Sequence, residues 1–330
     1  MGWPRDSSQT WWSALAAGKT SDRPPIAGPT VGLGILAAIG MLIVLVMGAT
    51  VTSTGSAQGC GHDWPLCNGR LIPEFAVSTF IEFSHRVVTA AESLLIILLA
   101  VALLVFWRDR RPIRALVPAM LASLVAQALM GAWAVKYPQA SAVLALHFGL
   151  SLIALAATTL TAAYAWQSYA GRVPTELAPP RLRWLALGNA GYLYLLVYSG
   201  AYIRHTGAAS ACTAWPLCGH TVGSLAFVVD LAHRAGAGLA LLAALALLAM
   251  CLRSRRRDLT LSATALVGGL LAQGAGGAYL VASGFALGAE LLHAALTGVV
   301  FTAACLVCLQ VLLAGERSQQ PIRSSTTLAA

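Results

Sequence analysis

The chain is organised as long apolar runs separated by short polar segments. The run from Val31 to Val51 contains no charged residue over 21 positions. As a helix rising about 1.5 Å per residue it would be about 31 Å long, which matches the roughly 30 Å thickness of a bilayer's hydrocarbon core. This run therefore predicts a transmembrane helix. Similar runs predict further spans at about residues 78–107, 113–135, 139–166, 183–203, 222–252, 260–282 and 287–313.

Composition and charge agree with this interpretation. Of the 330 residues, 58% are hydrophobic and 10% are charged, whereas soluble domains contain about 25% charged residues. Cytoplasmic loops of membrane proteins retain Lys and Arg, and with a cytoplasmic N-terminus sixteen of the 21 Lys and Arg residues fall in cytoplasmic segments. We therefore expect a multi-pass protein of a bacterial inner membrane with both termini in the cytoplasm. Topology accounts for the net charge of +9, so we expect no nucleic-acid partner.

The two halves of the chain repeat each other. Three sequence blocks and one histidine of the first half, His147, return in the second half with their order and spacing kept, His147 as His293. This repetition predicts a tandem duplication of a four-helix unit. Because a unit with an even number of spans ends on the side where it began, the halves share one orientation about an axis along the membrane normal. The blocks are TGSAQGCGHDWPLC at 54–67 with TGAASACTAWPLC at 206–218, FSHR at 83–86 with LAHR at 231–234, and QALMGAWAV at 127–135 with QGAGGAYLV at 273–281.

The predicted fold is all-α and integral to the membrane, with eight transmembrane helices arranged as two tandem pseudo-symmetric four-helix bundles. No apolar core with a small-residue cleavage site precedes the first span, so we expect a polar tail instead of a signal peptide. The expected segments are a cytoplasmic tail at 1–30, an N-terminal bundle at 31–170, a cytoplasmic linker at 171–182, a C-terminal bundle at 183–313 and a cytoplasmic tail at 314–330.

Four of the seven histidines fall within predicted spans. They lie on the second, fourth, sixth and eighth spans, all of which run inward, roughly six to eleven residues or about 9 to 17 Å below the outer boundary. These residues are His85, His147, His233 and His293. Facing imidazoles at one depth in a four-helix bundle can clamp a haem iron between axial ligands. Zinc is the alternative metal, but structural zinc sites draw four ligands from one cluster; hydrogen-bonded core histidines are the other alternative.

Acidic residues precede three of these histidines by three positions: Glu82, Asp230 and Glu290. Residues three apart share a helix face, so each acid could orient an imidazole, transfer protons or reach the membrane interface. We interpret Asp230 and Glu290 as interfacial or supporting groups. Glu92 lies seven residues past His85 on the same face and deeper in the span, where both a structural and a functional role stay open.

Arg86 and Arg234 directly follow the histidines of the second and sixth spans. One interpretation is that their side chains extend to the membrane interface. The functional interpretation is that they bind haem propionates, which would then point outward.

The outer loops contain two cysteine pairs, Cys60 with Cys67 and Cys212 with Cys218. Disulfide bonds form on the oxidising side of a bacterial inner membrane, and both pairs fall on that side by the charge argument. We predict two short-loop disulfides, with a zinc site or free thiols as the alternatives.

The EFSHR block at 82–86, the paired WPLC loops, His147 and the repeated histidines of the second half closely resemble haem A synthase, in the bacterial form with a cysteine pair in each half. The resemblance covers about residues 31–313. It implies that His85 and His147 hold the substrate haem and that a haem b is bound in the C-terminal half.

For that haem b the resemblance implies His233 and His293 as axial ligands. It also implies that Glu82 takes part in catalysis, together with the substrate ligands His85 and His147. The reaction would oxidise the C8 methyl of haem O to a formyl group through hydroxylated intermediates. Asp230 occupies the repeat position of Glu82, so acidity there is not unique to the substrate half.

Two other functions remain open. A transmembrane dihaem electron carrier of the cytochrome b561 type also uses four helix histidines but usually places haems near both faces, whereas all four histidines here lie on the outer side. A non-enzymatic haem-binding protein would leave its haem unchanged. The candidate partners are haem O, haem O synthase, a membrane electron acceptor, the lipid bilayer and a second copy of the chain in a homo-oligomer.

Overall fold

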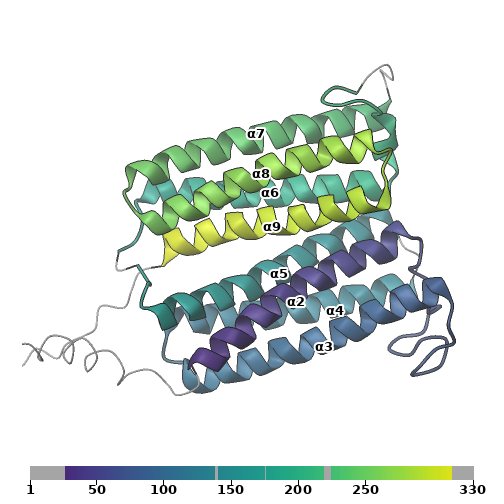
Figure 1. Ribbon diagram of the computed structural model, residues 1–330, viewed down its shortest axis with the longest axis horizontal. Coiled ribbons are helices and arrows are strands. Elements are labelled where there is room, and N and C mark those ends of the chain that lie inside the picture. Colours follow the sequence, from purple (N-terminus) through teal and green to yellow (C-terminus); the bar gives the residue numbers. More distant parts are fainter. Residues whose placement is uncertain (1–26, 138–139, 175, 219–223, 314–330) are drawn as a thin grey trace, which may run out of the picture.

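The computed structural model of the chain describes residues 27–137, 140–174, 176–218 and 224–313, and within them it contains eight long α-helices and no strand (Figure 1). Nearly all of the two predicted tails lies outside the described residues. The helices are α2 (Ala27–Ser53), α3 (Val77–Phe106), α4 (Arg111–Lys136), α5 (Ser141–Ala170), α6 (Pro180–His205), α7 (Leu225–Arg253), α8 (Arg257–Ala282) and α9 (Leu287–Leu312), with a short 3-10 helix η1 (Ala208–Ala211) after α6.

The prediction of an all-helical membrane protein is confirmed. Seven of the eight long helices are long and apolar enough to cross a membrane by length and composition. The exception is α6, whose hydropathy is lowered by Asn189 and four tyrosines; it lies against α5, α7 and α9. Several predicted boundaries were wrong by three or four residues: α2 already begins at Ala27, α6 at Pro180 and α8 at Arg257, α7 begins only at Leu225, and α5 extends to Ala170.

The eight helices form two groups of four that lie side by side (Figure 1). In the first group α2 and α4 each pack against both α3 and α5, and in the second α6 and α8 each pack against both α7 and α9. The groups meet through α2 and α5 on one side and α6 and α9 on the other. The two most buried helices, α5 and α9, lie at this contact.

The long helices span the same layer. The first residue of α2 and the last of α9 lie at one end of the molecule, which we call the terminal end, and the cysteine-containing segments after α2 and α6 lie at the other, which we call the disulfide end (Figure 1). This arrangement is what an even number of crossings in each half requires.

Large apolar side chains concentrate in the half of each bundle near the terminal end. The first cluster takes its residues from the start of α2, the end of α3, the start of α4 and the later part of α5, including Leu99, Leu103 and Met120. The second cluster repeats the pattern in α6–α9, with Leu247 and Leu259 fully buried. The four intramembrane histidines lie outside these clusters, in the half of each bundle nearer the disulfide end.

We expect Gly298→Val to destabilise the contact between the two groups. A Cβ at Gly298 of α9 would lie 3.1 Å from Leu155 Cδ2 of α5 and 3.4 Å from Leu42 Cδ1 of α2, and such overpacking costs about 1–3 kcal/mol. The control is Gly268→Val on α8, where nothing lies within 4 Å of an added Cβ. Thermal unfolding of the two purified variants in the same detergent measures the difference, and equal melting temperatures would contradict the assigned contact.

Candidate haem-binding site

The four intramembrane histidines lie at matching depths. His85 is the ninth residue of α3 and His233 the ninth of α7, while His147 is the seventh of α5 and His293 the seventh of α9. At about 1.5 Å per residue, all four lie about 9 to 12 Å from the helix ends at the disulfide end. They therefore form one layer, above the two apolar clusters.

Within each group the two histidines come from diagonally opposed helices. The helices α3 and α5 are separated by α2 and α4 on either side, and α7 and α9 by α6 and α8. His85 and His147 therefore lie on one diagonal of the first bundle, and His233 and His293 on one diagonal of the second, at the shared depth. Each bundle thus brings two imidazoles together.

Each imidazole packs against a glycine of the preceding helix. A Cβ added at Gly48 of α2 would lie 3.3 Å from His85 Cε1, and one at Gly200 of α6 only 2.7 Å from His233 Cε1. The same relation holds for Gly131 with His147, at 3.4 Å, and for Gly277 with His293, at 3.5 Å. The four glycines occupy repeat-equivalent positions, and sequence reasoning missed them although two lie in the repeated QALMGAWAV and QGAGGAYLV blocks.

Three of the four histidines have one buried ring nitrogen with no partner in the described part of the chain. Nδ1 of His85, His147 and His293 is buried without a hydrogen-bond partner among the described residues. Unpaired buried polar groups are rare in folded proteins and indicate a missing partner. Each bundle therefore offers two imidazoles at one depth, each packed against a glycine and three of the four with an unpaired ring nitrogen, and such a pair would suit the ligands of a haem iron.

A glutamine adjoins the second histidine of each bundle. Gln127 Nε2 donates to Ser151 Oγ at 2.7 Å, and its repeat equivalent Gln273 donates to Thr297 Oγ1 at 2.8 Å. Gln273 Nε2 also lies 3.1 Å from His293 Nε2. The hydroxyls of Ser151 and Thr297 in turn donate to the carbonyls of the histidines four residues earlier. These paired side chains connect neighbouring helices at the histidine layer.

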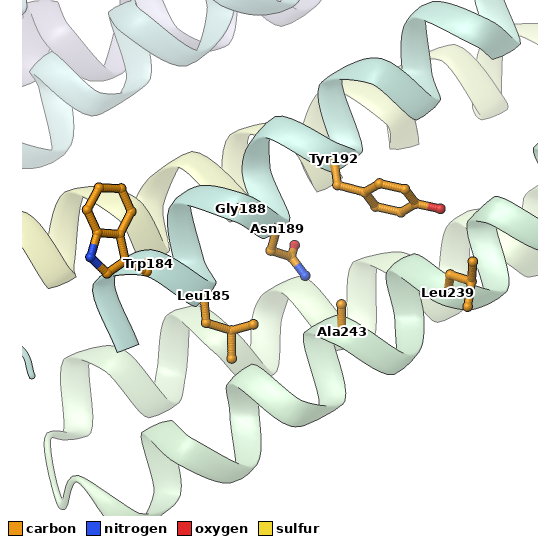
Figure 2. Close-up of a pocket in the computed structure, with 7 residues that line it drawn as sticks. All are labelled: Trp184, Leu185, Gly188, Asn189, Tyr192, Leu239 and Ala243. Carbon is orange, nitrogen blue, oxygen red and sulfur yellow. The ribbon is translucent and has the colours of Figure 1, made fainter. Parts of the chain in front are cut away.

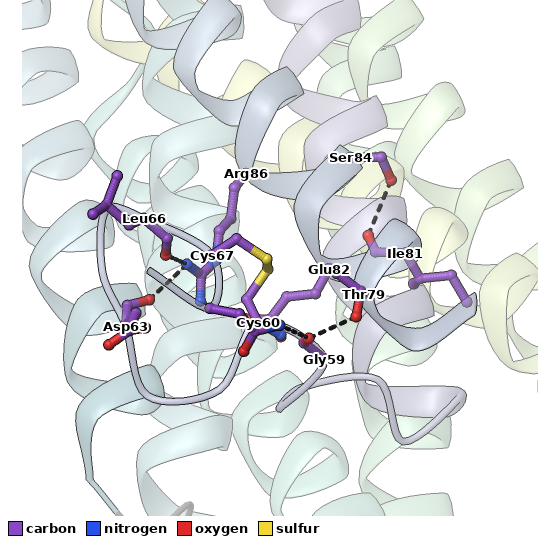
Figure 3. Close-up of a disulfide and its surroundings, with 11 residues drawn as sticks. Gly59, Cys60, Asp63, Leu66, Cys67, Thr79, Ile81, Glu82, Ser84 and Arg86 are labelled. Atoms are coloured by element: carbon purple, nitrogen blue, oxygen red, sulfur yellow. Dashed lines mark hydrogen bonds and ion pairs between the residues drawn. A yellow bond between two sulfur atoms is a disulfide. The ribbon is translucent and has the colours of Figure 1, made fainter. Parts of the chain in front are cut away.

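Glu82 is buried beneath the first cysteine loop (Figure 3). Its Oε2 accepts a hydrogen bond from the backbone N–H of Cys60 at 2.9 Å, and its Oε1 pairs with Arg86 at 2.6 Å. Arg86 also donates to the carbonyls of Asp63 and Leu66, both at 2.8 Å. The acid and the arginine therefore anchor the loop to α3, one turn from His85.

The second half repeats this arrangement. Arg234 pairs with the buried Asp230 at 3.0 Å. It also donates to the carbonyls of Ala214, at 2.5 Å, and of Pro216 and Cys212, both at 3.3 Å. The structure thus gives both arginines protein partners in the loops. Their contact with haem propionates stays a prediction.

Both predicted cysteine pairs are bonded. Disulfides join Cys60 to Cys67 and Cys212 to Cys218, with Cα–Cα distances of 4.4 and 4.3 Å. Cys212 and Cys218 also lie near Asp230 in a group compact enough for a metal ion. Since the disulfide consumes both thiolates, this group is not suited to the zinc alternative.

Comparison with known proteins identifies the family. Residues 73–305 match the family model COX15-CtaA, described as cytochrome oxidase assembly protein. Among curated relatives, the chain is 38% identical to Heme A synthase of an Exiguobacterium species (strain AT1b) over 257 residues, covering 78% of this chain and 84% of the relative. It is 33% identical to Heme A synthase of Bacillus pumilus over 305 residues, covering 88% and 98%. The chain belongs to the COX15-CtaA family.

This member of the COX15-CtaA family carries one buried acid in its first half that the repeat does not reproduce. Glu92 on α3 is 3% exposed and its Oε1 has no hydrogen-bond partner in the described part of the chain. A Cβ at Gly40 of α2 would overlap the Glu92 carboxylate, so only glycine leaves space for it. The repeat positions of Gly40 and Glu92 are Tyr192 and Ala240. In the second half the larger side chain of the pair is therefore the tyrosine on α6, not the residue on α7.

Glu290, also interpreted from the sequence as an interfacial or supporting group, holds an arginine that links the two halves. Its carboxylate pairs with Arg204 of α6 at 3.1 Å, and Arg204 also donates to the hydroxyl of Ser53 on α2. Arg204 lies in the last turn of α6. Glu290 is thus a partly buried ion-pair partner rather than a free interfacial charge.

We expect Arg86→Met to release the first cysteine loop. The variant leaves the buried Glu82 carboxylate without its counter-ion, and breaking a buried ion pair costs about 3–5 kcal/mol. Arg70→Met is the matched control, since its pair with Glu74 is largely exposed and worth about 0–1 kcal/mol.

Two measurements on these variants check the expectation: the free energy of unfolding in detergent and the rate at which a water-soluble reductant opens the Cys60–Cys67 disulfide. Arg86→Met should unfold more easily and be reduced several-fold faster. Equal behaviour of the two variants would show that the loop does not depend on Arg86.

Proposed function

We propose that this protein is a haem A synthase, an oxidoreductase that converts the C8 methyl of haem O to a formyl group through hydroxylated intermediates. The observation that carries the proposal is the layer of four glycine-seated histidines, paired within each bundle, in a chain whose family relatives bear the name Heme A synthase. All four histidines lie near the disulfide end, which favours this function over a dihaem carrier with haems near both faces.

The proposal gives the two bundles different roles, with haem O held between His85 and His147 and a haem b between His233 and His293. Two differences between the bundles support this division. Ser199 Oγ lies 3.1 Å from His233 Nδ1, whereas the repeat position in the first half is Met47, so the first ligand of the C-terminal bundle is fixed more firmly. The helices α3 and α4 also approach each other least closely of the neighbouring pairs, as suits a bundle that must admit and release its haem.

In this mechanism the haem b supplies one-electron transfer. The protein's own residues position the substrate: His85 and His147 orient the porphyrin, and Gly48 and Gly131 set the place of each imidazole. The outer loop, held by Arg86, covers the histidine layer and limits access of water from the disulfide end.

Glu82 is the proposed proton acceptor. With water as the oxygen source, conversion of the methyl to the formyl group releases four protons and four electrons; the electrons would leave singly through the haem b to a membrane acceptor. A positioned base contributes roughly 10²- to 10⁴-fold to such proton transfers. Arg86 and the Cys60 amide hold the carboxylate one turn from His85. We further propose that the protein resides in the bacterial inner membrane, with the disulfide end outside and both termini in the cytoplasm.

Substitution of the histidines should distinguish the roles of the two bundles. His233→Ala or His293→Ala removes an axial ligand of the haem b and should abolish its optical signal. His85→Ala or His147→Ala should instead stop product formation and leave most of the haem b in place. Unchanged spectra in both C-terminal variants would contradict the assignment of ligands.

Glu82→Gln keeps the volume of the side chain and one hydrogen-bond acceptor but removes the base and the ionic pair with Arg86; Arg86→Met, described above, reports the loss of that pair while the base is kept. In Glu82→Gln the amide oxygen can still accept the hydrogen bond from Cys60, but the base is lost. We expect the variant to keep both haem sites and accumulate haem O or its hydroxylated intermediate, while Asp230→Asn, its repeat-equivalent control, forms haem A nearly normally. Extracted haems are identified by chromatography and mass spectrometry.

Two results of this comparison would overturn the assignment of Glu82. Equal yields of haem A in both variants would make Glu82 a loop anchor alone. A defect confined to Asp230→Asn would mean that the roles of the two bundles are reversed.

A further inference from the structure

A groove between α6 and α7 lies in the half of the second bundle near the terminal end, away from the histidines (Figure 2). Its volume is about 320 Å³, within the lower range of small-molecule sites. The lining is apolar apart from one amide, with an aromatic side chain at each end and small residues between. Its main lining residues are Trp184, Gly188, Asn189, Tyr192, Leu239 and Ala243.

Asn189 is the one amide in this groove. Its side chain projects from α6 toward α7 (Figure 2) and the residue is 3% exposed. Neither Nδ2 nor Oδ1 has a hydrogen-bond partner among the residues that the structure describes. An unsatisfied amide is costly in an environment without water, so its donor and acceptor together indicate a ligand.

The depth of Asn189 restricts the ligand. Asn189 is the tenth residue of α6 and lies about 14 Å from its first residue. Because the helix is about 39 Å long and the hydrocarbon core about 30 Å thick, Asn189 lies about 9 Å inside the hydrocarbon. Phospholipid ester groups stay at the interface. The ligand must therefore carry a polar oxygen on an apolar body into the membrane.

Comparison of the two halves indicates that the fold does not require the amide of Asn189. The position equivalent to Asn189 in the first half is Ala37, which is fully buried, and the position equivalent to Tyr192 is Gly40. Both bundles pack, yet the amide and the aromatic end wall occur only in the bundle to which we assign the haem b.

We propose that this groove binds the ring of an isoprenoid quinone. One amide can donate to a quinone carbonyl and accept from a quinol hydroxyl, so Asn189 suits both redox forms. Gly188 and Ala243 leave room for a flat ring between the aromatic side chains of Trp184 and Tyr192. The choice of a quinone over a redox-inert amphiphile rests on the proposed function, which needs a membrane-soluble electron partner.

A second groove lies between Asn189 and the histidine layer, and Tyr192 lines both grooves. This second groove, of about 360 Å³ along the same helix pair, includes Ser199 and His233. A ring bound at Asn189 would therefore lie between the same two helices, α6 and α7, as His233.

Photolabelling tests the site directly. The full-length protein in lipid nanodiscs is irradiated with an azidobenzoquinone carrying a decyl tail, with and without excess decylubiquinone, and labelled peptides are mapped. We expect competable labelling of the α6 and α7 segments around Asn189 and Ala243. Asn189→Leu should weaken binding about tenfold, because it removes the hydrogen bond while keeping similar volume.

Two further variants on α7 serve as a matched pair. Ala243→Phe fills the groove and should also abolish labelling, whereas Leu242→Phe adds the same ring on the exposed neighbouring position and should leave it unchanged. The optical spectrum of the bound haem reports whether each variant is folded.

Several results would overturn the proposal: no label on α6 or α7, labelling that Asn189→Leu leaves unchanged, or equal competition by a phospholipid with short acyl chains. These outcomes are independent of turnover. A protein that forms haem A but does not bind the quinone here contradicts this site alone, whereas one that binds the quinone and forms no haem A contradicts the proposed function alone.

Discussion

The structure depends first on the absence of water in the bilayer core, where every backbone N–H and C=O must find a partner within the chain. Helices meet that demand for the backbone, so the remaining polar side chains become informative. In both bundles the apolar clusters fill the half near the terminal end. The histidines occupy the other half, where imidazoles of diagonal helices share one depth and glycines of the preceding helices receive them. The apolar clusters and the histidine layer thus lie at different depths of the same helices.

At the disulfide end, each bundle is closed by the same small unit. A buried acid pairs with the arginine one turn further along its helix, and that arginine holds the carbonyls of a disulfide-closed loop. The histidine lies between these two residues in the sequence. A shift of the loop would therefore act on the same helical turn that carries the imidazole. Both halves contain this unit, and the features that differ lie at other positions. Ser199 in the second half replaces Met47 in the first. Tyr192 and Ala240 in the second half replace Gly40 and Glu92 in the first. These differences are where the two bundles can acquire separate roles.

Much of the fold was predictable because hydrophobic length and repetition are properties of the sequence itself. The spans, the depth of the histidines and the two disulfides followed from run lengths, repeat offsets and loop spacing. The partners of Arg86 and Arg234 did not, because the loop carbonyls that bind them depend on how 54–76 and 206–218 fold back over the helices. The contacts between the glycines and the histidines, and the unpaired amide of Asn189, likewise depend on which helix faces pack together. A single glycine or asparagine in a span does not show which face it occupies in the folded bundle.

The central claim is that the two bundles hold different haems, one of them the substrate. The most direct test is to purify the unmodified protein, extract its haems, and identify and quantify them by chromatography and mass spectrometry. The account predicts haem b together with haem O or its hydroxylated or formyl products. Haem b alone, at two per chain, would contradict it and would instead indicate an electron carrier with two equivalent sites.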